Sequence, residues 1–128
     1  MNILLVEDSR FLCASIAKAL GKRGHRVSTA KDGEEALKLA RENVPQLIIL
    51  DMMLPKISGP DVLRSLKQHS STQDIPVIVL TSLSERNAEK LHQTGAAAFV
   101  PKSEALLEND AQALIQAIHN VMGETVRS

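Results

Sequence analysis

The sequence predicts a single α/β domain in which five parallel strands alternate with five helices. Four short apolar runs lack the polar alternation of a half-exposed strand, which indicates strands buried on both faces of a parallel sheet. Segments with helical periodicity separate these runs, and the connections between them are short. Right-handed crossovers then place helices on both faces of the sheet, so we expect a three-layer sandwich.

The four apolar runs are expected to form the buried strands. They are Ile3–Val6, Leu47–Leu50, Val77–Leu80 and Ala96–Val100. A fifth and weaker strand, His25–Ala30, carries polar residues along its length. Polar residues suit a strand at the edge of a sheet, so we expect this strand to lie there.

Cap and breaker residues mark where the helices begin and end. Ser9 is a candidate N-cap for the first helix, and Gly24 is a candidate stop. The segment Asp32–Glu35 resembles a capping box at the start of the second helix, and Gly59–Pro60 suits the start of the third. The fourth helical segment, 84–94, has few apolar anchors, so we expect it to be the most solvated helix. The last helix carries an apolar face of Leu114, Ile115, Ile118, Val121 and Met122.

Length and composition fit one globular domain and exclude several classes of function. The chain has 128 residues and zero net charge, so it lacks the cationic excess that direct nucleic-acid binding requires. Its two aromatic residues, Phe11 and Phe99, are too few to offer stacking platforms for bases or sugars. The one cysteine, Cys13, excludes an internal disulfide and a cysteine-based zinc site.

The length of the chain and its apolar runs also predict the domain boundaries and the compartment. We expect one domain over residues 1–122, followed by a C-terminal tail over residues 123–128. The apolar runs are far shorter than a membrane span, and no basic segment precedes the first strand as in a signal peptide. The sequence therefore predicts a cytoplasmic protein that does not bind membranes.

Polar side chains follow the apolar runs at the points where the strands end. In chain order they are Glu7, Asp8, Asp51, Thr81 and Lys102. In an open parallel sheet the carboxyl ends of the strands meet at one edge, where ligands bind. We therefore expect these side chains to form one site.

The chemistry of this set favours a phosphoryl site. Three carboxylates that converge repel one another unless a cation lies among them, and Mg²⁺ prefers such oxygen ligands and also binds phosphate oxygens. Lys102 adds a positive charge and Thr81 a hydroxyl, both suited to phosphoryl oxygens. No Ser–His–Asp arrangement is evident, so we expect a carboxylate nucleophile. Asp51 is the best candidate because it stands alone at the end of a buried strand.

Short motifs at the strand ends occur in a specific order along the chain. They are Val6–Ser9, Leu50–Pro55 with Gly59, Leu80–Ser82, Gly95–Phe99 and Pro101–Lys102. Each motif is weak alone, but the ordered set is specific and covers about residues 2–122. In this set the chain resembles the receiver domain of response regulators, the phosphoacceptor module of two-component signalling.

The resemblance implies a fold and a metal site. It implies a flavodoxin-like (βα)5 fold with strand order 2-1-3-4-5. It also implies that Asp51 is the phosphoacceptor and that Glu7 and Asp8 hold Mg²⁺ together with Asp51. By the same resemblance, the backbone carbonyl of Met53 is a further metal ligand.

The resemblance also implies a switch that responds to phosphorylation. Thr81 matches the switch hydroxyl of the family, Phe99 the switch aromatic and Lys102 the lysine of the site. We expect Thr81 to move toward the phosphoryl group, and Phe99 to rotate into the space released. The surface expected to change includes the fourth helix, the fifth strand and the last helix.

The chain departs from the family pattern at three places. The family usually has proline after the lysine, whereas here Ser103 follows Lys102 and Pro101 precedes it, which excludes a cis Lys–Pro peptide. The segment 103–109 is about one turn longer than usual. Glu7 stands where Asp is commoner, and its longer side chain suits a metal contact through water.

The predicted function is a phosphorylation switch. A histidine kinase or histidine phosphotransfer protein would donate a phosphoryl group to Asp51 in a Mg²⁺-dependent reaction, and the altered surface would bind a downstream effector protein or domain. A weak dimer is a further candidate assembly. The chain would catalyse its own phosphorylation and a slow dephosphorylation, because Met53 and Leu83 offer no polar group to orient a water. Lys56, in the loop after Asp51, is interpreted as a solvated lysine.

Three alternatives remain at this point. A phosphorylation-independent interaction module of the same fold is disfavoured because every expected site position holds a competent residue. A phosphatase with an aspartyl intermediate would want a second acid two residues after the nucleophile, where Met53 stands. A flavin or nucleotide binder would want a loop rich in Gly, Ser or Thr after the first strand, where Glu7–Arg10 is acidic.

Overall fold

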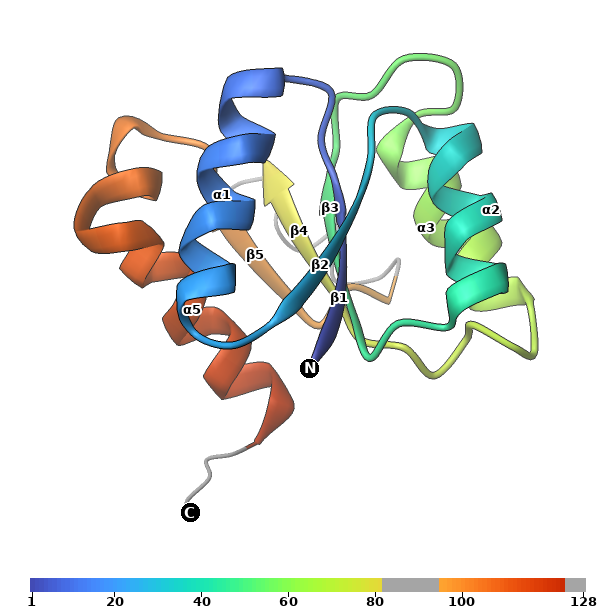
Figure 1. Cartoon of the computed structure of the whole chain (residues 1–128). Helices are drawn as coiled ribbons and strands as arrows, with labels where there is room; N and C mark the ends of the chain where they lie inside the picture. The colour runs from blue at the N-terminus through green and yellow to red at the C-terminus, as the bar shows by residue number, and fades with distance from the viewer. Residues whose placement is uncertain (82–94, 124–128) are drawn as a thin grey trace.

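The computed structural model describes residues 1–81 and 95–123, which form a parallel sheet flanked by helices (Figure 1). The sheet has five strands in the order β2-β1-β3-β4-β5, which confirms the predicted flavodoxin-like order. The strands are β1 Asn2–Val6, β2 Arg26–Ala30, β3 Leu47–Asp51, β4 Val77–Thr81 and β5 Ala98–Pro101. Because β3 and β4 extend to Asp51 and Thr81, these two site residues are the last residues of buried strands.

Helices connect the strands in the predicted order. They are α1 Arg10–Lys22, α2 Gly33–Asn43, α3 Gly59–Gln68 and α5 Glu108–Met122, with a short 3-10 helix, η2, at Glu104–Leu107. The predicted helix over 84–94 and most of the predicted tail lie outside the described residues. No helix within residues 1–81 and 95–123 is long and apolar enough to cross a membrane.

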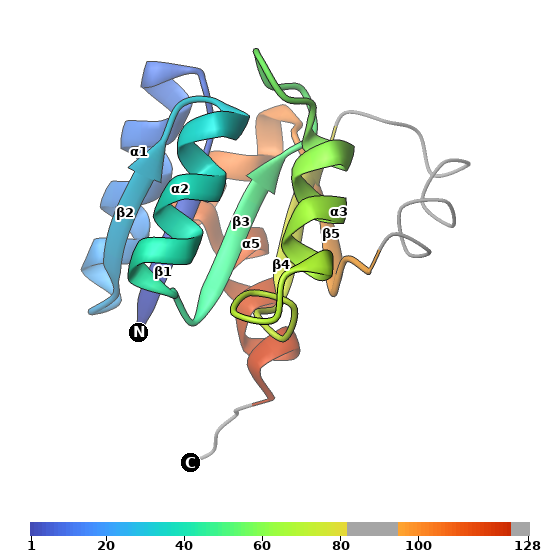
Figure 2. The same ribbon diagram turned by 90° about the vertical axis from the view of Figure 1, so that its right-hand side faces the viewer.

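The helices cover both faces of the sheet and bury two apolar cores. Helices α1 and α5 lie on one face, and Figure 2 shows α2 and α3 together on the other. Within β1, Ile3 and Leu5 belong to the core under α1 and α5, whereas Leu4 and Val6 belong to the core under α2 and α3. This alternation between two cores explains why the apolar runs of β1, β3 and β4 show no alternation with polar residues.

The edge position of β2 follows from its polar composition. Only Ala30 of this strand is buried, and β2 pairs with β1 alone. Strands β3 and β4 are instead buried at all five positions, as expected for the centre of the sheet. The last strand begins at Ala98, two residues later than the apolar run predicts, and includes Pro101. Strand ends commonly differ from sequence patterns by such a margin.

Side-chain caps begin three of the helices. The side chains of Ser9, Asp32 and Ser58 each accept a hydrogen bond from the backbone N–H three residues later. Glu35 completes the predicted capping box in a modified form, because its Oε1 accepts from the backbone N–H of Lys31 at 3.0 Å rather than from that of Asp32. The first helix ends before Gly24, whose φ of +88° suits glycine.

The entry to α5 is irregular. The segment 103–109, expected to carry an extra turn, contains η2 and then a left-handed stretch at Asn109, Asp110 and Ala111, with φ of 53°, 56° and 61°. Left-handed backbone costs roughly 1–2 kcal/mol per non-glycine residue, so this stretch is strained. Asp110 is fixed from outside by an ion pair with Lys22 at 3.3 Å, which ties α5 to α1.

Two glycines hold the loop between β3 and α3 against its neighbours. A Cβ on Gly59 would lie 2.5 Å from Met52 Cα and 2.7 Å from the carbonyl oxygen of Asp51. The backbone N–H of Gly59 also donates to the Met52 carbonyl oxygen at 3.2 Å. On the other side of the loop, a Cβ on Gly33 would lie 2.5 Å from the carbonyl oxygen of Ile57. These close approaches fix the loop that follows Asp51.

We expect the substitution Gly59→Ala to lower the free energy of unfolding by about 1–3 kcal/mol, the usual cost of overpacking. The added methyl must push the backbone of Asp51 and Met52 away, because no flexible side chain can yield. Urea unfolding measures the change. The control is Gly21→Ala within α1, where nothing lies within 4 Å of the added methyl and a gain of about 0.5–1 kcal/mol is expected. Equal effects of the two substitutions would contradict the close packing at Gly59.

Candidate functional site

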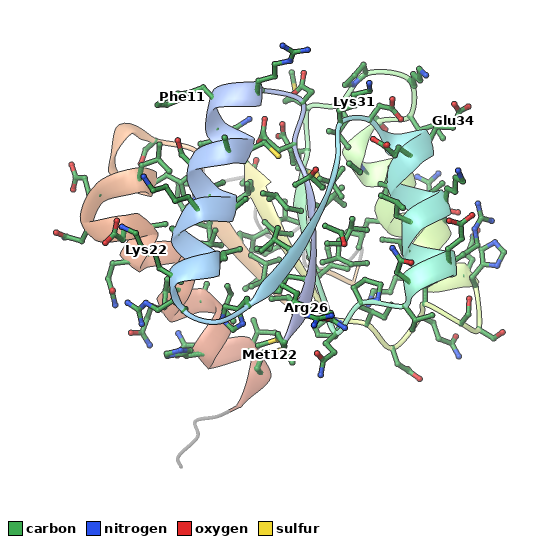
Figure 3. The ribbon with its side chains drawn as sticks, viewed as in Figure 1. Phe11, Lys22, Arg26, Lys31, Glu34 and Met122 are labelled. Carbon is green, nitrogen blue, oxygen red and sulfur yellow. The ribbon has the colours of Figure 1, made fainter. Side chains whose placement is uncertain are left out.

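The predicted site residues gather where the strands end. Glu7 follows β1 directly, and Asp51 and Thr81 are the last residues of β3 and β4. Lys102 follows β5, whose last residue pairs with Thr81 across the sheet. Figure 3 labels Phe11, near the start of α1, and Lys31, directly after β2, at this end of the molecule.

Lys102 forms the centre of the site. Its Nζ lies 3.0 Å from Asp51 Oδ2 and 3.4 Å from Glu7 Oε1. Its backbone N–H donates to the Thr81 carbonyl oxygen at 2.9 Å, which continues the pairing between β4 and β5. The described residues contain no cis peptide. Lys102 therefore reaches Asp51 although Ser103, not proline, follows it.

Backbone N–H groups orient the two buried carboxylates. The N–H of Ser9 donates to Glu7 Oε2 at 3.1 Å, and the N–H of Met53 donates to Asp51 Oδ1 at 3.1 Å. In each carboxylate, one oxygen thus accepts from the backbone N–H two residues later, and the other is directed toward Lys102. Neither N–H donor is predictable from the sequence, because a backbone group has no signature in the residue pattern.

Burial and charge shift the pKa of both Glu7 and Lys102. Burial is the main cause that raises the pKa of Glu7 to about 7, and the negative charge of Asp51 adds to it. The Ser9 N–H and the charge of Lys102 act against this rise. Burial lowers the pKa of Lys102, but the hydrogen bond and charge of Asp51, followed by Glu7, outweigh it and leave that pKa raised.

The acidic cluster fits a divalent cation. Carboxylate oxygens of Glu7, Asp8 and Asp51 lie within 4.8 Å of one another, and Asp8 is exposed to solvent. Glu7 Oε1 is buried and, apart from the ion pair with Lys102 Nζ at 3.4 Å, accepts no hydrogen bond from residues 1–81 or 95–123. A buried oxygen without a hydrogen bond is costly, and a cation among the carboxylates would remove that cost. The three predicted carboxylate ligands thus lie close enough together to hold one cation.

The remaining predicted residues lie around this cluster. Thr81 is buried, and Phe99, half-buried in β5, packs against the core under α2 and α3. The side chain of Met53 is exposed beside the site, while its N–H serves Asp51. Leu83 lies outside the described residues.

Lys56 is a residue whose contacts the sequence did not reveal. The sequence predicts a solvated lysine here. In the structure its Nζ lies 3.6 Å from Asp32 Oδ2 and 3.6 Å from Glu34 Oε1. It also has a left-handed φ of +69°. Neither the ion pairs between Lys56 and the start of α2 nor the left-handed backbone can be predicted from the residue pattern of the loop.

The raised pKa of Glu7 predicts a pH dependence of stability in metal-free buffer. Between about pH 4.5 and 7 the folded state binds a proton that the unfolded state has lost, so Glu7 lowers stability as the pH rises, by at most about 1.4 kcal/mol per pH unit. Lys102, with its pKa raised above the ordinary value, contributes constant stability in this range and loses it only in strong alkali. We therefore expect Glu7→Gln to be more stable than the native chain at pH 8, with the advantage shrinking toward pH 5.

Urea unfolding at several pH values, in the presence of a chelator, measures this advantage. Burial lowers the pKa of His25, which changes stability with the opposite sign as the pH rises, so only the difference between the two proteins isolates Glu7. A difference that stays constant from pH 5 to 8 would contradict the assignment.

Comparison with known proteins agrees with the geometry. A family model of the response regulator receiver domain matches residues 3–119. Transcriptional regulatory protein AfsQ1 of Streptomyces coelicolor is 42% identical over 84 residues, which cover 66% of this chain and 36% of that protein. Response regulator MprA of Mycobacterium sp. (strain KMS) is 40% identical over 111 residues, covering 84% of this chain and 46% of that protein. The chain therefore spans less than half the length of these two relatives.

Solved structures give the same result. Chemotaxis response regulator CheY4 of Vibrio cholerae has a TM-score of 0.84 at 25% identity, over 94% of this chain and 97% of that chain. The Mn²⁺-bound form of response regulator Rcp1 has a TM-score of 0.80 at 29% identity, over 98% of this chain and 96% of that chain. The fold, the family model and these relatives together establish that this chain belongs to the receiver domains of response regulators, which act in two-component signalling.

Proposed function

We propose that the chain is a phosphoacceptor switch that takes a phosphoryl group onto Asp51 from a histidine kinase or a histidine phosphotransfer protein. One observation carries this proposal: Lys102 Nζ lies 3.0 Å from Asp51 beside three carboxylates that fit a divalent cation. A carboxylate nucleophile next to a cation site and a lysine suits phosphoryl transfer, in which positioning and charge neutralisation provide most of the catalysis.

The transfer requires little more than placement of the reacting groups. An oxygen of Asp51 attacks the phosphorus of a phosphohistidine, and an O–P bond forms as the N–P bond breaks. The imidazole nitrogen leaves with the electron pair of that bond. The Met53 N–H on Oδ1 and Lys102 on Oδ2 hold the carboxylate in place for this attack. Lys102 is then also the cation nearest to the incoming phosphoryl oxygens.

The proposed cofactor is Mg²⁺. Glu7, Asp8, Asp51 and the backbone carbonyl of Met53 would hold it. When bound, Mg²⁺ supplies positive charge that stabilises the phosphoryl oxygens during transfer. The Mn²⁺-bound form of response regulator Rcp1, a structural relative of this chain, supports a divalent cation here.

The proposed response begins at Thr81 and Phe99. Thr81 ends the strand next to β3, and Phe99 pairs with Val79 in the neighbouring strand, so both residues are tied to β4. A hydroxyl drawn toward the new phosphoryl oxygens would free space for the aromatic ring, and the surface of β5 and α5 would change for an effector. The exposed Met53 side chain has no polar group to orient a water, so we also propose slow self-dephosphorylation.

We predict that acetyl phosphate with Mg²⁺ adds one phosphoryl group to the native chain and none to an Asp51→Asn variant. The amide of asparagine is a poor nucleophile and carries no charge for the metal or for Lys102. Intact-mass spectrometry measures the adduct. The matched control is Asp61→Asn, because Asp61 lies exposed on α3 and pairs only with Arg64 among the described residues. Equal labelling of Asp51→Asn and the native chain would overturn the phosphoacceptor assignment, and no labelling of the native chain would favour a phosphorylation-independent module.

We predict that Thr81→Ala leaves phosphorylation by acetyl phosphate largely intact but weakens the response of Phe99. The hydroxyl acts after transfer, and Lys102 and the carboxylates still carry the reaction. NMR resonances of the Phe99 ring, compared before and after phosphorylation, measure the response. Thr81→Ser keeps the hydroxyl and should keep most of the change. If the resonances of Thr81→Ala move as far as those of the native chain, the switch role of Thr81 is wrong.

A further inference from the structure

We propose that Lys56 is a positioning residue for the metal and phosphoacceptor site. Its ion pairs to the start of α2 hold the loop 52–58 so that Asp51 and Met53 keep their orientation. The inference rests on the proposed function, because it concerns the same metal ligands. It adds a residue that touches neither the metal nor the phosphoryl group.

The first observation is a bridge between two parts of the chain. Lys56 Nζ lies 3.6 Å from Asp32 Oδ2 and 3.6 Å from Glu34 Oε1 (Figure 3 labels Glu34 at the start of α2). Asp32 is buried and caps α2, since its Oδ1 accepts from the Glu35 N–H at 2.8 Å. That N–H, and after it the charge of Lys56, hold the pKa of Asp32 below its ordinary value against its burial. Lys56 is thus paired with a carboxylate that the helix itself fixes.

The second observation is the close packing of the loop on the same helix start. Gly33 follows Asp32, and a Cβ there would lie 2.5 Å from the carbonyl oxygen and 2.7 Å from the Cβ of Ile57. Lys56 and Ile57 therefore both contact the first residues of α2. The loop is held at this end by α2 and at its other end by Gly59 against Met52.

The third observation links the loop to the reacting carboxylate. Met53 lies between the two fixed ends, and its N–H donates to Asp51 Oδ1 at 3.1 Å. The Ile57 N–H donates to the Pro55 carbonyl oxygen at 2.9 Å and closes a tight turn around Lys56. A displacement of Lys56 would therefore also displace the neighbouring loop residues, including Met53. Such a displacement of the loop would tilt the Asp51 carboxylate and move the Met53 carbonyl, which are two of the proposed metal ligands.

The backbone of Lys56 adopts a conformation that is costly for a lysine. Its φ of +69° is easier for glycine or asparagine than for lysine. The ion pairs to Asp32 and Glu34 act against this backbone cost.

Positioning and direct electrostatics predict opposite effects on metal binding. Removal of a positive charge near an acidic cluster should tighten cation binding if charge alone matters. Loss of a group that orients metal ligands instead weakens binding, typically by about 10–100-fold. Because Lys56 is 59% exposed and its ion pairs are weak, we expect a loss near or below the lower end of that range.

The experiment is calorimetric titration of the folded chain with Mg²⁺ alone. Lys56→Met should weaken Mg²⁺ binding by about 3–10-fold, while Lys56→Arg, which restores the charge and the reach, should stay close to the native chain. Lys38→Met is the matched control, because Lys38 is exposed on α2 near Lys56 and has no ion pair to a described residue. It should bind as tightly as the native chain or slightly more tightly.

A second measurement needs no metal. The amide proton of Met53 reports the hydrogen bond to Asp51, so in metal-free protein its NMR shift should move in Lys56→Met and Lys56→Gly but not in Lys38→Met. Lys56→Gly removes the ion pairs to α2 and also removes the backbone cost of the left-handed φ. It therefore separates the effect of the ion pairs from that of the backbone strain. An unmoved Met53 amide in both Lys56 variants, or Mg²⁺ binding by Lys56→Met as tight as that of the native chain, would overturn the inference. If the native chain binds no Mg²⁺, the proposed function fails, while the Met53 amide still decides whether Lys56 positions the loop.

Discussion

The balance between one lysine and two buried carboxylates is the constraint on which the site depends. Asp51 and Glu7 are only 0% and 2% exposed, and each follows a run of four buried apolar residues. Charges in such surroundings are costly unless an opposite charge and hydrogen bonds compensate them. Lys102 provides that charge at 3.0 Å and 3.4 Å, and the N–H groups of Met53 and Ser9 provide the hydrogen bonds. Burial raises the pKa of Glu7, and the charge of Asp51 adds to that rise. One ammonium cannot neutralise two carboxylates together with Asp8, so the cluster suits a cation.

The sheet buries these carboxylates and also fixes their positions relative to Lys102. Every residue of β3 is buried, so Asp51 cannot turn to solvent without opening the core. The register between β4 and β5 fixes Lys102, through the Thr81 carbonyl, opposite the strand that carries Asp51. The loop after β3 is pinned by Gly59 and Gly33, and Lys56 closes it against α2. The loop geometry therefore bears on the proposed metal site, because the backbone carbonyl of Met53, one of the proposed ligands, cannot adjust by rotating a side chain.

The sequence predicted those features that depend on burial and chain order. Apolar runs without alternation indicated β1, β3 and β4, because each of these strands faces two cores. The order of acids, hydroxyl and lysine indicated one site, because parallel strands end at one edge. Features that depend on the backbone were missed: the N–H donors of Ser9 and Met53, the left-handed stretch from Asn109 to Ala111, and the bridge from Lys56 to α2. Any residue type can supply an N–H group, and lysine is common on solvated loops, so neither stands out in a sequence.

The most direct test of this account is the free energy of unfolding as a function of Mg²⁺ concentration. A cation that binds only the folded state stabilises it by about 2.7 kcal/mol at one hundred times its dissociation constant. We expect the native chain to become steadily more stable once Mg²⁺ exceeds that constant. We also expect Asp8→Asn, which alters only the exposed ligand, to show little or no gain in the same range. A native chain whose stability does not depend on Mg²⁺, or an equal gain in both proteins, would contradict a cation site built from Glu7, Asp8 and Asp51.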